Sequence, residues 1–359
     1  MGKVLIISPM EYGTQTDHIF WCKYLKKEKN VSHLSYGKNF LNQYVDGIRI
    51  IMLSNVKKFR KLKLVKYASK MIKKNNYEVV IIDYFPGCSL LKLFNNKQRF
   101  ILDIRSGTIK SNKLLKNIRD ILIRMESCFF KEVTIIDKKL SEKLKVKKSK
   151  IKILPLGSDC FFSLDDIKRK EQPCFTVVYV GSFIMRNIEQ TLEAFKILKE
   201  RGYEGCIKYI LIGSGINQSY DNSIKKYIDN NKMTNMIDFV GRIPHNELKK
   251  YFIKSNIGLS YIPITKYFDL QPPTKTYEYI INGLFCIATK TKANKDIVNN
   301  INGVLIDDNA IDLANAIELT YKNFKQIDPI EVHNTLKEYT WENIVNNILI
   351  NIINNRKDI

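Results

Sequence analysis

The chain has 359 residues, of which 45% are hydrophobic and 26% charged, and its formal net charge is +23. This length is too great for one hydrophobic core and suits two domains of about 150–200 residues each. Seven scattered cysteines without a Cys-x-x-Cys spacing argue against a disulfide framework or a zinc site and favour a reducing cytosol.

The sequence also argues against an integral membrane protein. The sequence contains no run of about 18 or more apolar residues, which is the length that a transmembrane helix needs. Met1–Lys3 leads directly into an apolar segment and shows no cleavable signal pattern. We therefore expect a cytoplasmic protein.

The N-terminal half alternates short, β-branched apolar runs with segments of helical period. The apolar runs predict strands at Val4–Ser8, Ile48–Leu53, Glu78–Tyr84, Arg99–Ile104, Val133–Asp137 and Ile151–Pro155. The helical spacing predicts helices at Gln15–Lys29, Lys57–Lys74 and Lys113–Lys131. Such alternation is typical of a parallel sheet that is covered on both faces.

The C-terminal half continues the same alternation. Strands are predicted at Phe175–Val180, Lys208–Gly213, Ile237–Gly241, Asn256–Pro263, Phe285–Thr289 and Asn302–Ile306. Helices are predicted at Ile188–Arg201, near Ser223–Asn231, at Asn246–Ser255, from Thr274 and around Asp312–Ile317. The sequence therefore predicts an α/β fold of two doubly wound, Rossmann-like domains that face a cleft. Ligands are expected at the carboxyl ends of the strands.

The segment Gln271–Tyr279 reads QPPTKTYEY and is the most informative one. Its prolines stop a strand and pre-set a first helical turn, where unpaired N–H groups favour an anion such as a diphosphate. Lys275 and Glu278 share one face of that turn, so the cation could meet phosphate while the carboxylate accepts from a sugar diol. The plain alternative is a solvated ion pair worth about 0.2–0.5 kcal/mol.

This segment is followed in order by the strand Phe285–Thr289, by Asn302-Gly303 and by the helix of Asp312–Ile317. That order resembles the donor-binding half of the retaining family-4 glycosyltransferases. The resemblance covers about residues 175–341. It implies a GT-B fold with an acceptor-binding domain over residues 1–160, a linker over 161–173 and a donor-binding domain over 174–338. It also implies a last helix over residues 339–359, opened by Thr340-Trp341-Glu342, that crosses back to the first domain.

The resemblance also implies roles for donor-site residues. Arg186 and Lys275 would hold the donor diphosphate, and Glu278 would hold the ribose. Ser182 stands where the family has an Arg, and Leu270 stands where it has a first acid, with Asp269 one place away. The implied donor-binding set is Gly181, Ser182, Arg242, Ile243, Asp269, Gln271, Pro273, Thr274 and Glu278. For Arg186 the alternative is an exposed helix-start residue, although a helix N-terminus repels a cation.

In the N-terminal half the resemblance points to two places. Gly13 and Thr14 follow the first strand, where the family has a glycine-rich loop near the reaction centre. Asp103 and Arg105 follow a middle strand and could orient the acceptor hydroxyl; an Asp–Arg pair that closes a strand end is the equal alternative. The four histidines, which show no metal-ligand spacing and which we interpret as structural or solvated, are His18, His33, His245 and His333.

The positive charge is concentrated in the N-terminal half. Residues 1–170 hold 37 Lys and Arg against 15 Asp and Glu, whereas residues 171–359 hold 22 against 21. This asymmetry predicts an anionic partner, such as an anionic membrane surface or an acidic glycan. No recognised nucleic-acid-binding motif accompanies it, so we expect no nucleic-acid partner.

Two predicted basic helices are candidates for contact with that partner. Lys57–Lys74 and Lys113–Lys131 carry apolar residues at helical spacing among basic ones, and in the second helix these are Leu114, Ile118, Ile121, Met125 and Phe129. Such a stripe can face the core, with a solvated charged side. Alternatively it can lie against anionic lipid.

We therefore predict a metal-independent glycosyltransferase that uses no cofactor. It would move a sugar from a nucleoside diphosphate donor to a lipid-linked or polysaccharide acceptor, peripherally at the inner face of the membrane. The resemblance implies front-face displacement, with protein cations replacing a metal, and closure of the two domains. A rival prediction is a non-catalytic, transferase-like subunit that binds a glycan or a partner enzyme.

Overall fold

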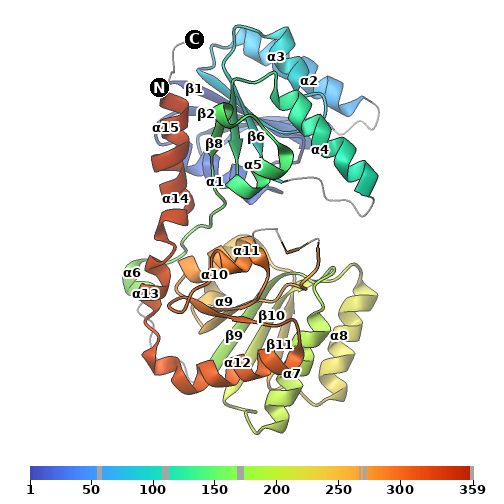
Figure 1. The fold of residues 1–359 in the computed structure, drawn as a ribbon, viewed down its shortest axis with the longest axis vertical. Helices are drawn as coiled ribbons and strands as arrows, with labels where there is room; N and C mark the ends of the chain where they lie inside the picture. The colour runs from blue at the N-terminus through green and yellow to red at the C-terminus, as the bar shows by residue number, and fades with distance from the viewer. Residues whose placement is uncertain (55–58, 107–112, 168–173, 267, 270–272, 356–359) are drawn as a thin grey trace. The chain divides into compact units, whose positions relative to one another are not determined.

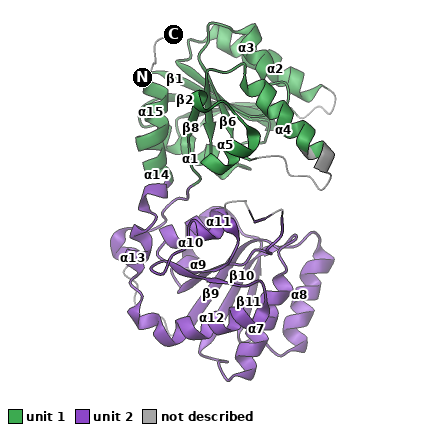
Figure 2. Ribbon diagram, viewed as in Figure 1, with its two compact units in different colours: residues 1–156, 341–359 green, residues 157–340 purple. Residues whose placement is uncertain are grey.

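The computed structural model describes residues 1–54, 59–106, 113–167, 174–266, 268–269 and 273–355. The chain forms two compact units (Figure 2). Unit 1 comprises residues 1–156 and 341–359, and unit 2 comprises residues 157–340. The predicted α/β architecture of two Rossmann-like units is confirmed.

Unit 1 is built on an eight-stranded sheet in the order β3-β4-β2-β1-β5-β6-β7-β8. Its strands are β1 (Lys3–Ile7), β2 (Asn30–Gly37), β3 (Leu41–Val45), β4 (Ile48–Ser54), β5 (Val79–Asp83), β6 (Phe100–Ile104), β7 (Glu132–Ile135) and β8 (Ile151–Ile153). All neighbouring strands are parallel except β3 and β4. The central strands are continuous apolar runs because helices bury them on both faces.

Helices cover both faces of this sheet (Figure 1). One face carries α2 (Arg60–Lys74), α3 (Ser89–Phe94), α4 (Lys113–Ser127) and α5 (Lys138–Leu144). The other carries α1 (Thr16–Leu25) and the last helical segment, which consists of α14 (Trp341–Ile344), a π-helical turn (Val345–Leu349) and α15 (Ile350–Asn354). Trp341 stacks on Phe20 of α1 at 6.4 Å between ring centroids. The C-terminal helix is therefore part of the core of unit 1.

The sequence pattern missed β2 and β3. Strand β2 is buried along nearly its whole length, yet it contains Ser32, His33 and Ser35, so it shows neither an apolar run nor alternation. Strand β3 is mostly exposed and pairs only with β4, as an antiparallel edge. Both strands depend on tertiary pairing, which a local pattern does not contain.

Unit 2 contains a six-stranded parallel sheet in the order β11-β10-β9-β12-β13-β14. Its strands are β9 (Phe175–Ser182), β10 (Ile207–Ser214), β11 (Ile237–Gly241), β12 (Ile257–Ser260), β13 (Phe285–Thr289) and β14 (Gly303–Ile306). Its helices are α6 (Leu164–Ile167), α7 (Ile188–Glu200), α8 (Gln218–Asn230), α9 (Lys249–Phe252), α10 (Thr274–Ile281), α11 (Lys292–Lys295), α12 (Ala310–Asn323) and α13 (Pro329–Asn334). Helices α7, α8 and α12 pack on one face, and α9, α10 and α13 pack on the other.

The start of the predicted linker lies within unit 2. The backbone N–H of Phe161 donates to Asn282 at 2.7 Å, and Ile167 at the end of α6 is completely buried. Residues 168–173, the rest of that prediction, lie outside the described residues. The described part of the predicted linker is therefore packed against the end of α10.

Within the described residues, no helix is both long and apolar enough to cross a membrane.

Candidate functional site

The candidate site in unit 2 centres on the first turn of α10. Pro273 precedes the helix in an extended conformation, and Thr274 is its exposed first residue. Thr276 is buried and shares a hydrogen bond of 2.8 Å with Ser260 of β12, which fixes the helix against the sheet. The N-terminal turn of α10 is thus held at the carboxyl end of β12, where the parallel sheet and the helix N-terminus both favour an anionic ligand.

Lys275 and Glu278 meet, as their spacing predicted. The Lys275 ammonium forms an ion pair with Oε2 of Glu278. The Lys275 side chain remains 30% exposed, whereas that of Glu278 is 5% exposed. Burial by itself would raise the pKa of Glu278, but the Lys275 charge and a hydrogen bond from His245 outweigh it and lower the pKa to about 2. Glu278 is therefore an ionised, buried acceptor.

His245 completes this cluster and was missed by the sequence analysis. Its Nε2 lies 2.6 Å from Oε1 of Glu278, so the two carboxylate oxygens contact two different side chains. The ring also packs edge-on against Phe161 at 5.4 Å. The interpretation of His245 as structural or solvated stays a prediction, and its contact with Glu278 adds it to the candidate site. Its place directly after the Arg242-Ile243-Pro244 stretch was the available signal.

Arg186 lies in the loop between β9 and α7, after Gly181 and Ser182 at the end of the strand. Its neighbours Met185 and Asn187 both have left-handed backbone conformations, which bend the loop sharply. The Arg186 guanidinium stacks on Phe268, 4.1 Å from the ring centroid. Strands β9 and β12 are parallel neighbours. Arg186 after β9 and Lys275 after β12 therefore lie at the same edge of the sheet.

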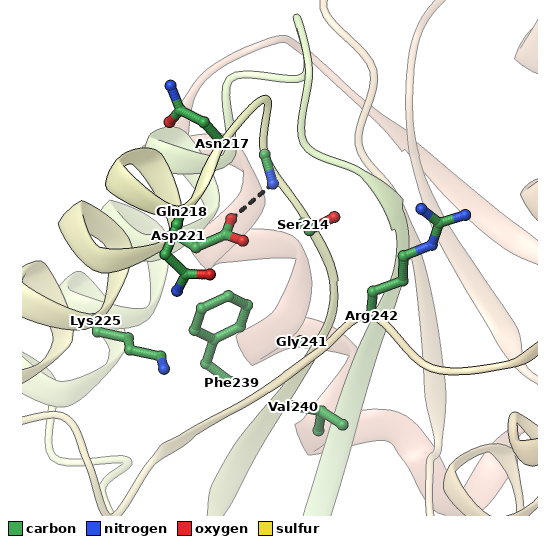
Figure 3. A pocket seen from close by; sticks show the side chains of 10 residues that line it. Ser214, Asn217, Gln218, Asp221, Lys225, Phe239, Val240, Gly241 and Arg242 are labelled. Atoms are coloured by element: carbon green, nitrogen blue, oxygen red, sulfur yellow. Dashed lines mark hydrogen bonds between the residues drawn. The ribbon is translucent and has the colours of Figure 1, made fainter.

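A pocket of about 420 Å³ opens beside this edge (Figure 3). It lies between the ends of β10 and β11 and the start of α8. Its lining residues are Ser214, Gly215, Asn217, Gln218, Asp221, Lys225, Phe239, Val240, Gly241 and Arg242. Asp221 accepts from the backbone N–H of Gly215 at 2.7 Å, which fixes the turn after β10. Among the predicted donor residues Arg242 lines the pocket, and Ile243 follows it.

Gly213 explains why β10 can end so close to β9. Its φ is +148°, and a Cβ at this position would overlap the carbonyl oxygen of Gly181. Only glycine therefore permits this approach of the two strand ends.

Of Asp269, Leu270 and Gln271, around the predicted first-acid position, only Asp269 is described, and it contacts Lys292. Oδ1 of Asp269 accepts from the backbone N–H of Lys292 at 2.9 Å, and Oδ2 is 3.2 Å from the Lys292 ammonium. This backbone hydrogen bond lowers the pKa of Asp269. The carboxylate is thus engaged at the start of α11. Gln271 and Leu270 lie outside the described residues.

In unit 1 the predicted pair Asp103 and Arg105 is buried at the end of β6. Asp103 is completely buried and accepts from Thr134 at 2.7 Å. The Arg105 guanidinium donates to Asp17 at 2.6 and 2.8 Å and to the Leu154 carbonyl at 2.7 Å. This geometry suits the alternative in which the pair closes a strand end, and an acceptor role for it stays a prediction.

The remaining predictions for unit 1 concern a loop and two histidines. Gly13 and Thr14 are exposed in the loop after β1, where Thr14 donates to the Glu11 carbonyl at 2.6 Å. His18 and His33 are both buried, with ring nitrogens 3.5 Å apart. Burial lowers the pKa of His18 to about 3. Among the described residues, no three His, Cys, Asp or Glu side chains gather as metal ligands would.

Comparison with solved structures identifies the fold. A structure of Anabaena Alr3699/HepE in complex with UDP aligns with a TM-score of 0.70 at 13% identity, over 98% of this chain and 99% of that one. The lipopolysaccharide outer core galactosyltransferase WaaB aligns with a TM-score of 0.66 at 14% identity, over 98% and 99%. A Burkholderia xenovorans trehalose-phosphate synthase gives 0.72 at 9%, over 98% and 100%. The two Rossmann-like units thus have the GT-B fold.

The sequence itself adds a family match. Residues 163–339, which lie within unit 2, match the family model described as "Glycosyl transferases group 1". No curated protein sequence matches the chain. The family match and the fold together support a glycosyltransferase of the GT-B class.

Proposed function

We propose that this protein is a retaining family-4 glycosyltransferase that moves a sugar from a nucleoside diphosphate sugar to a lipid-linked or polysaccharide acceptor, in cell-surface glycan biosynthesis. The observation that carries the proposal is the Lys275–Glu278–His245 cluster at the start of α10, inside the segment that matches the family. A HepE structure in complex with UDP-glucose supports a nucleotide-sugar donor. As a cytoplasmic protein held peripherally at the inner face of a membrane, it would meet a lipid-linked acceptor there.

In this proposal the cluster receives the donor's ribose diphosphate. Glu278 is ionised and buried, so its carboxylate accepts hydrogen bonds from the ribose diol. Lys275 is partly exposed and can turn from Glu278 to a phosphate oxygen. Arg186 offers a guanidinium to the same diphosphate, and the pocket beside Phe239 would take the nucleobase.

Transfer would then proceed by front-face displacement. The bond between the anomeric carbon and the diphosphate oxygen breaks, and the acceptor hydroxyl oxygen bonds to that carbon on the same face. The hydroxyl proton passes to the departing diphosphate. Arg186, Lys275 and the N-terminus of α10 stabilise the charge that develops on the leaving group, which is the role that a metal ion plays elsewhere. We therefore propose a metal-independent reaction that needs no cofactor.

The direct test removes the carboxylate. Glu278→Ala deletes two charge-assisted hydrogen bonds to the ribose, so we expect transfer to fall about 100-fold or more. Mass spectrometry would measure the product, with a screen of nucleotide sugars and a lipid acceptor extract. The matched control is Glu318→Ala on α12, an acid that also pairs with cations, Arg201 and Lys322. Full activity of Glu278→Ala would contradict the assignment.

One observation favours a different class of function. Ser182 stands where the family has a cation for the diphosphate, which suits a transferase-like subunit that binds a glycan or a partner enzyme without catalysis. Calorimetry with nucleoside diphosphates separates the two functions. An enzyme should take up at least one of them and lose that uptake in Glu278→Ala, whereas a non-catalytic subunit should take up none.

A further inference from the structure

Two of the seven cysteines stand opposite each other where β9 and β10 begin. These strands are parallel, and Phe175 is paired with Ile207 in their register. Cys174 directly precedes Phe175, and Cys206 directly precedes Ile207. The backbone N–H of Phe175 donates to the Cys206 carbonyl at 3.0 Å, so the pairing of the two segments extends to the cysteines. The sheet therefore brings together two thiols that are 32 residues apart in the sequence.

Both thiols lie on the side of the sheet that α12 covers. Residues opposite each other in neighbouring strands project their side chains to the same face. The Cys174 thiol donates to the Cys206 carbonyl oxygen at 3.0 Å, so it points toward the neighbouring segment. Tyr321 of α12 senses both cysteines: a hydrogen bond with the Cys206 side chain raises the pKa of its hydroxyl, and the Cys174 thiol acts in the same direction.

The spacing of these positions suits a disulfide. Neighbouring strands lie about 4.8 Å apart, and the Cα atoms of a disulfide are usually about 4.4–6.8 Å apart. The bond therefore needs no large movement of the backbone. A metal is the other possible partner of two thiols, and a structural zinc ion takes four ligands. Within the described ranges of the chain, no third His, Cys, Asp or Glu joins the pair in this way.

An oxidant in solution can reach this pair. Cys206 is exposed, and Cys174 is half-buried. Burial raises the pKa of the Cys174 thiol, while the charge of Lys208 acts in the opposite direction. An exposed thiol with a second thiol beside it is the arrangement of redox-sensitive cysteines. The fully buried cysteines, which are shielded from such an oxidant, are Cys22, Cys88 and Cys286.

We propose that Cys174 and Cys206 are a redox modification site and form a reversible disulfide when the protein meets hydrogen peroxide. The Cys206 thiolate sulfur attacks one peroxide oxygen, the O–O bond breaks, and the departing hydroxide takes up a proton to become water. The Cys174 thiolate then attacks the resulting sulfenic sulfur, and the sulfenic hydroxyl leaves as a second water. The two thiols lose two electrons to the peroxide. An excess of a thiol reductant, as in a reducing cytosol, reverses the bond.

The bond would fasten the start of β9 to the start of β10 and close a loop that contains α7. Such a bond restricts the unfolded chain more than the folded one, in which the two cysteines are already neighbours. Oxidation should therefore stabilise unit 2. The candidate donor residues Gly181 and Ser182 lie at the other end of β9, so the modification is independent of the proposed donor site.

Mass spectrometry of unreduced peptides tests the bond. After treatment with hydrogen peroxide, a peptide containing Cys174 should be joined to one containing Cys206, and dithiothreitol should separate them. Cys174→Ser should abolish this cross-link and leave Cys206 as a sulfenic acid that dimedone traps. The matched control is Cys128→Ser, which removes an exposed thiol of unit 1 and should leave the cross-link unchanged.

Proteolysis tests the effect on unit 2. Oxidation should slow cleavage within unit 2 at least about tenfold, and it should have no such effect in Cys174→Ser. Circular dichroism would verify that both serine variants are folded. Absence of the cross-link after peroxide treatment, or a cross-link that persists in Cys174→Ser, would overturn the assignment of the bond. A cleavage rate that oxidation leaves unchanged would overturn its stabilising role.

Discussion

Asp83 and Asp103 are neighbours across β5 and β6 at the carboxyl ends of these strands. Both are buried, and burial raises their pKa values from 3.8 to about 6 and about 7, although Arg105 acts in the opposite direction. A carboxyl group in such a place binds its proton more tightly in the folded chain than in the unfolded one.

This difference makes the stability of unit 1 depend on pH. The folded state binds more protons than the unfolded state between about pH 4 and about pH 7, so the free energy of unfolding should fall as pH rises through that window. Asp103→Asn, which cannot ionise, should reduce this fall by an amount on the order of 2 kcal/mol. Urea denaturation at a series of pH values would measure it. Asp238→Asn, at an exposed position in unit 2, is the control, and an unchanged pH profile in Asp103→Asn would contradict the expectation.

Contacts within one helical turn could be predicted from the sequence, whereas contacts between distant segments could not. The meeting of Lys275 and Glu278 follows from a spacing of three residues on a helix. The approach of His245 to Glu278 spans 33 residues, and that of Arg105 to Asp17 spans 88. Only the packed sheet brings those pairs together, so no local pattern contained them.

At the scale of elements, the position of α10 depends on a glycine in β12. A Cβ at Gly258 would overlap the ring of Tyr279, whose hydroxyl oxygen accepts from the backbone N–H of Val180 at 2.8 Å. Tyr279 follows Glu278 directly. Helix α10 can therefore lie low on the sheet, with its first turn at the strand ends, because β12 has no side chain at this position.

Gly258→Ala should consequently destabilise unit 2 by about 1–3 kcal/mol, since the core must move to admit a methyl group. Chemical denaturation would measure the loss. A double-mutant cycle supplies the control: in a Tyr279→Ala background the ring is gone, so Gly258→Ala should cost much less. If the cost is undiminished there, the overlap with Tyr279 is not its cause.

The elements that could be predicted are those whose periodicity is set by burial. Strands β1, β5 and β9 are apolar runs, and α7 has a clear apolar face. Helix α8 begins at Gln218, several residues before its predicted start near Ser223, because Asn217 caps it by accepting from Tyr220 at 2.9 Å. The polar first turn that follows hid this boundary from a pattern based on apolar spacing.

At the scale of the whole molecule, unit 1 depends on both ends of the described chain. Trp341, Ile344, Val345, Leu349 and Ile353 are all buried, and they belong to the same cluster as Val4 and Ile6 of β1. The hydrophobic clusters of unit 2 contain none of these residues. The two units therefore have separate cores.

Trp341→Ala should lower the free energy of unfolding of unit 1 by about 3–5 kcal/mol and leave unit 2 unaffected. The chain has two tryptophans, and the other, Trp21, is also buried in unit 1. Tryptophan fluorescence therefore reports on the unfolding of unit 1 alone. The rate of proteolytic cleavage within unit 2 would report on the unfolding of unit 2. Leu319→Ala on the surface of unit 2 is the control, and an equal loss in both units would contradict separate cores.

The same division has a consequence for the order of folding during synthesis. Domains usually fold as they leave the ribosome, beginning at the N-terminus. Here every residue of unit 2 has been made before Trp341 and the rest of the C-terminal helix are available to unit 1. During that interval the apolar residues of α1 that pack against this helix, including Phe20, lack their cover. We therefore expect the nascent chain to complete its second unit first and to depend on chaperones until the last helix closes the first.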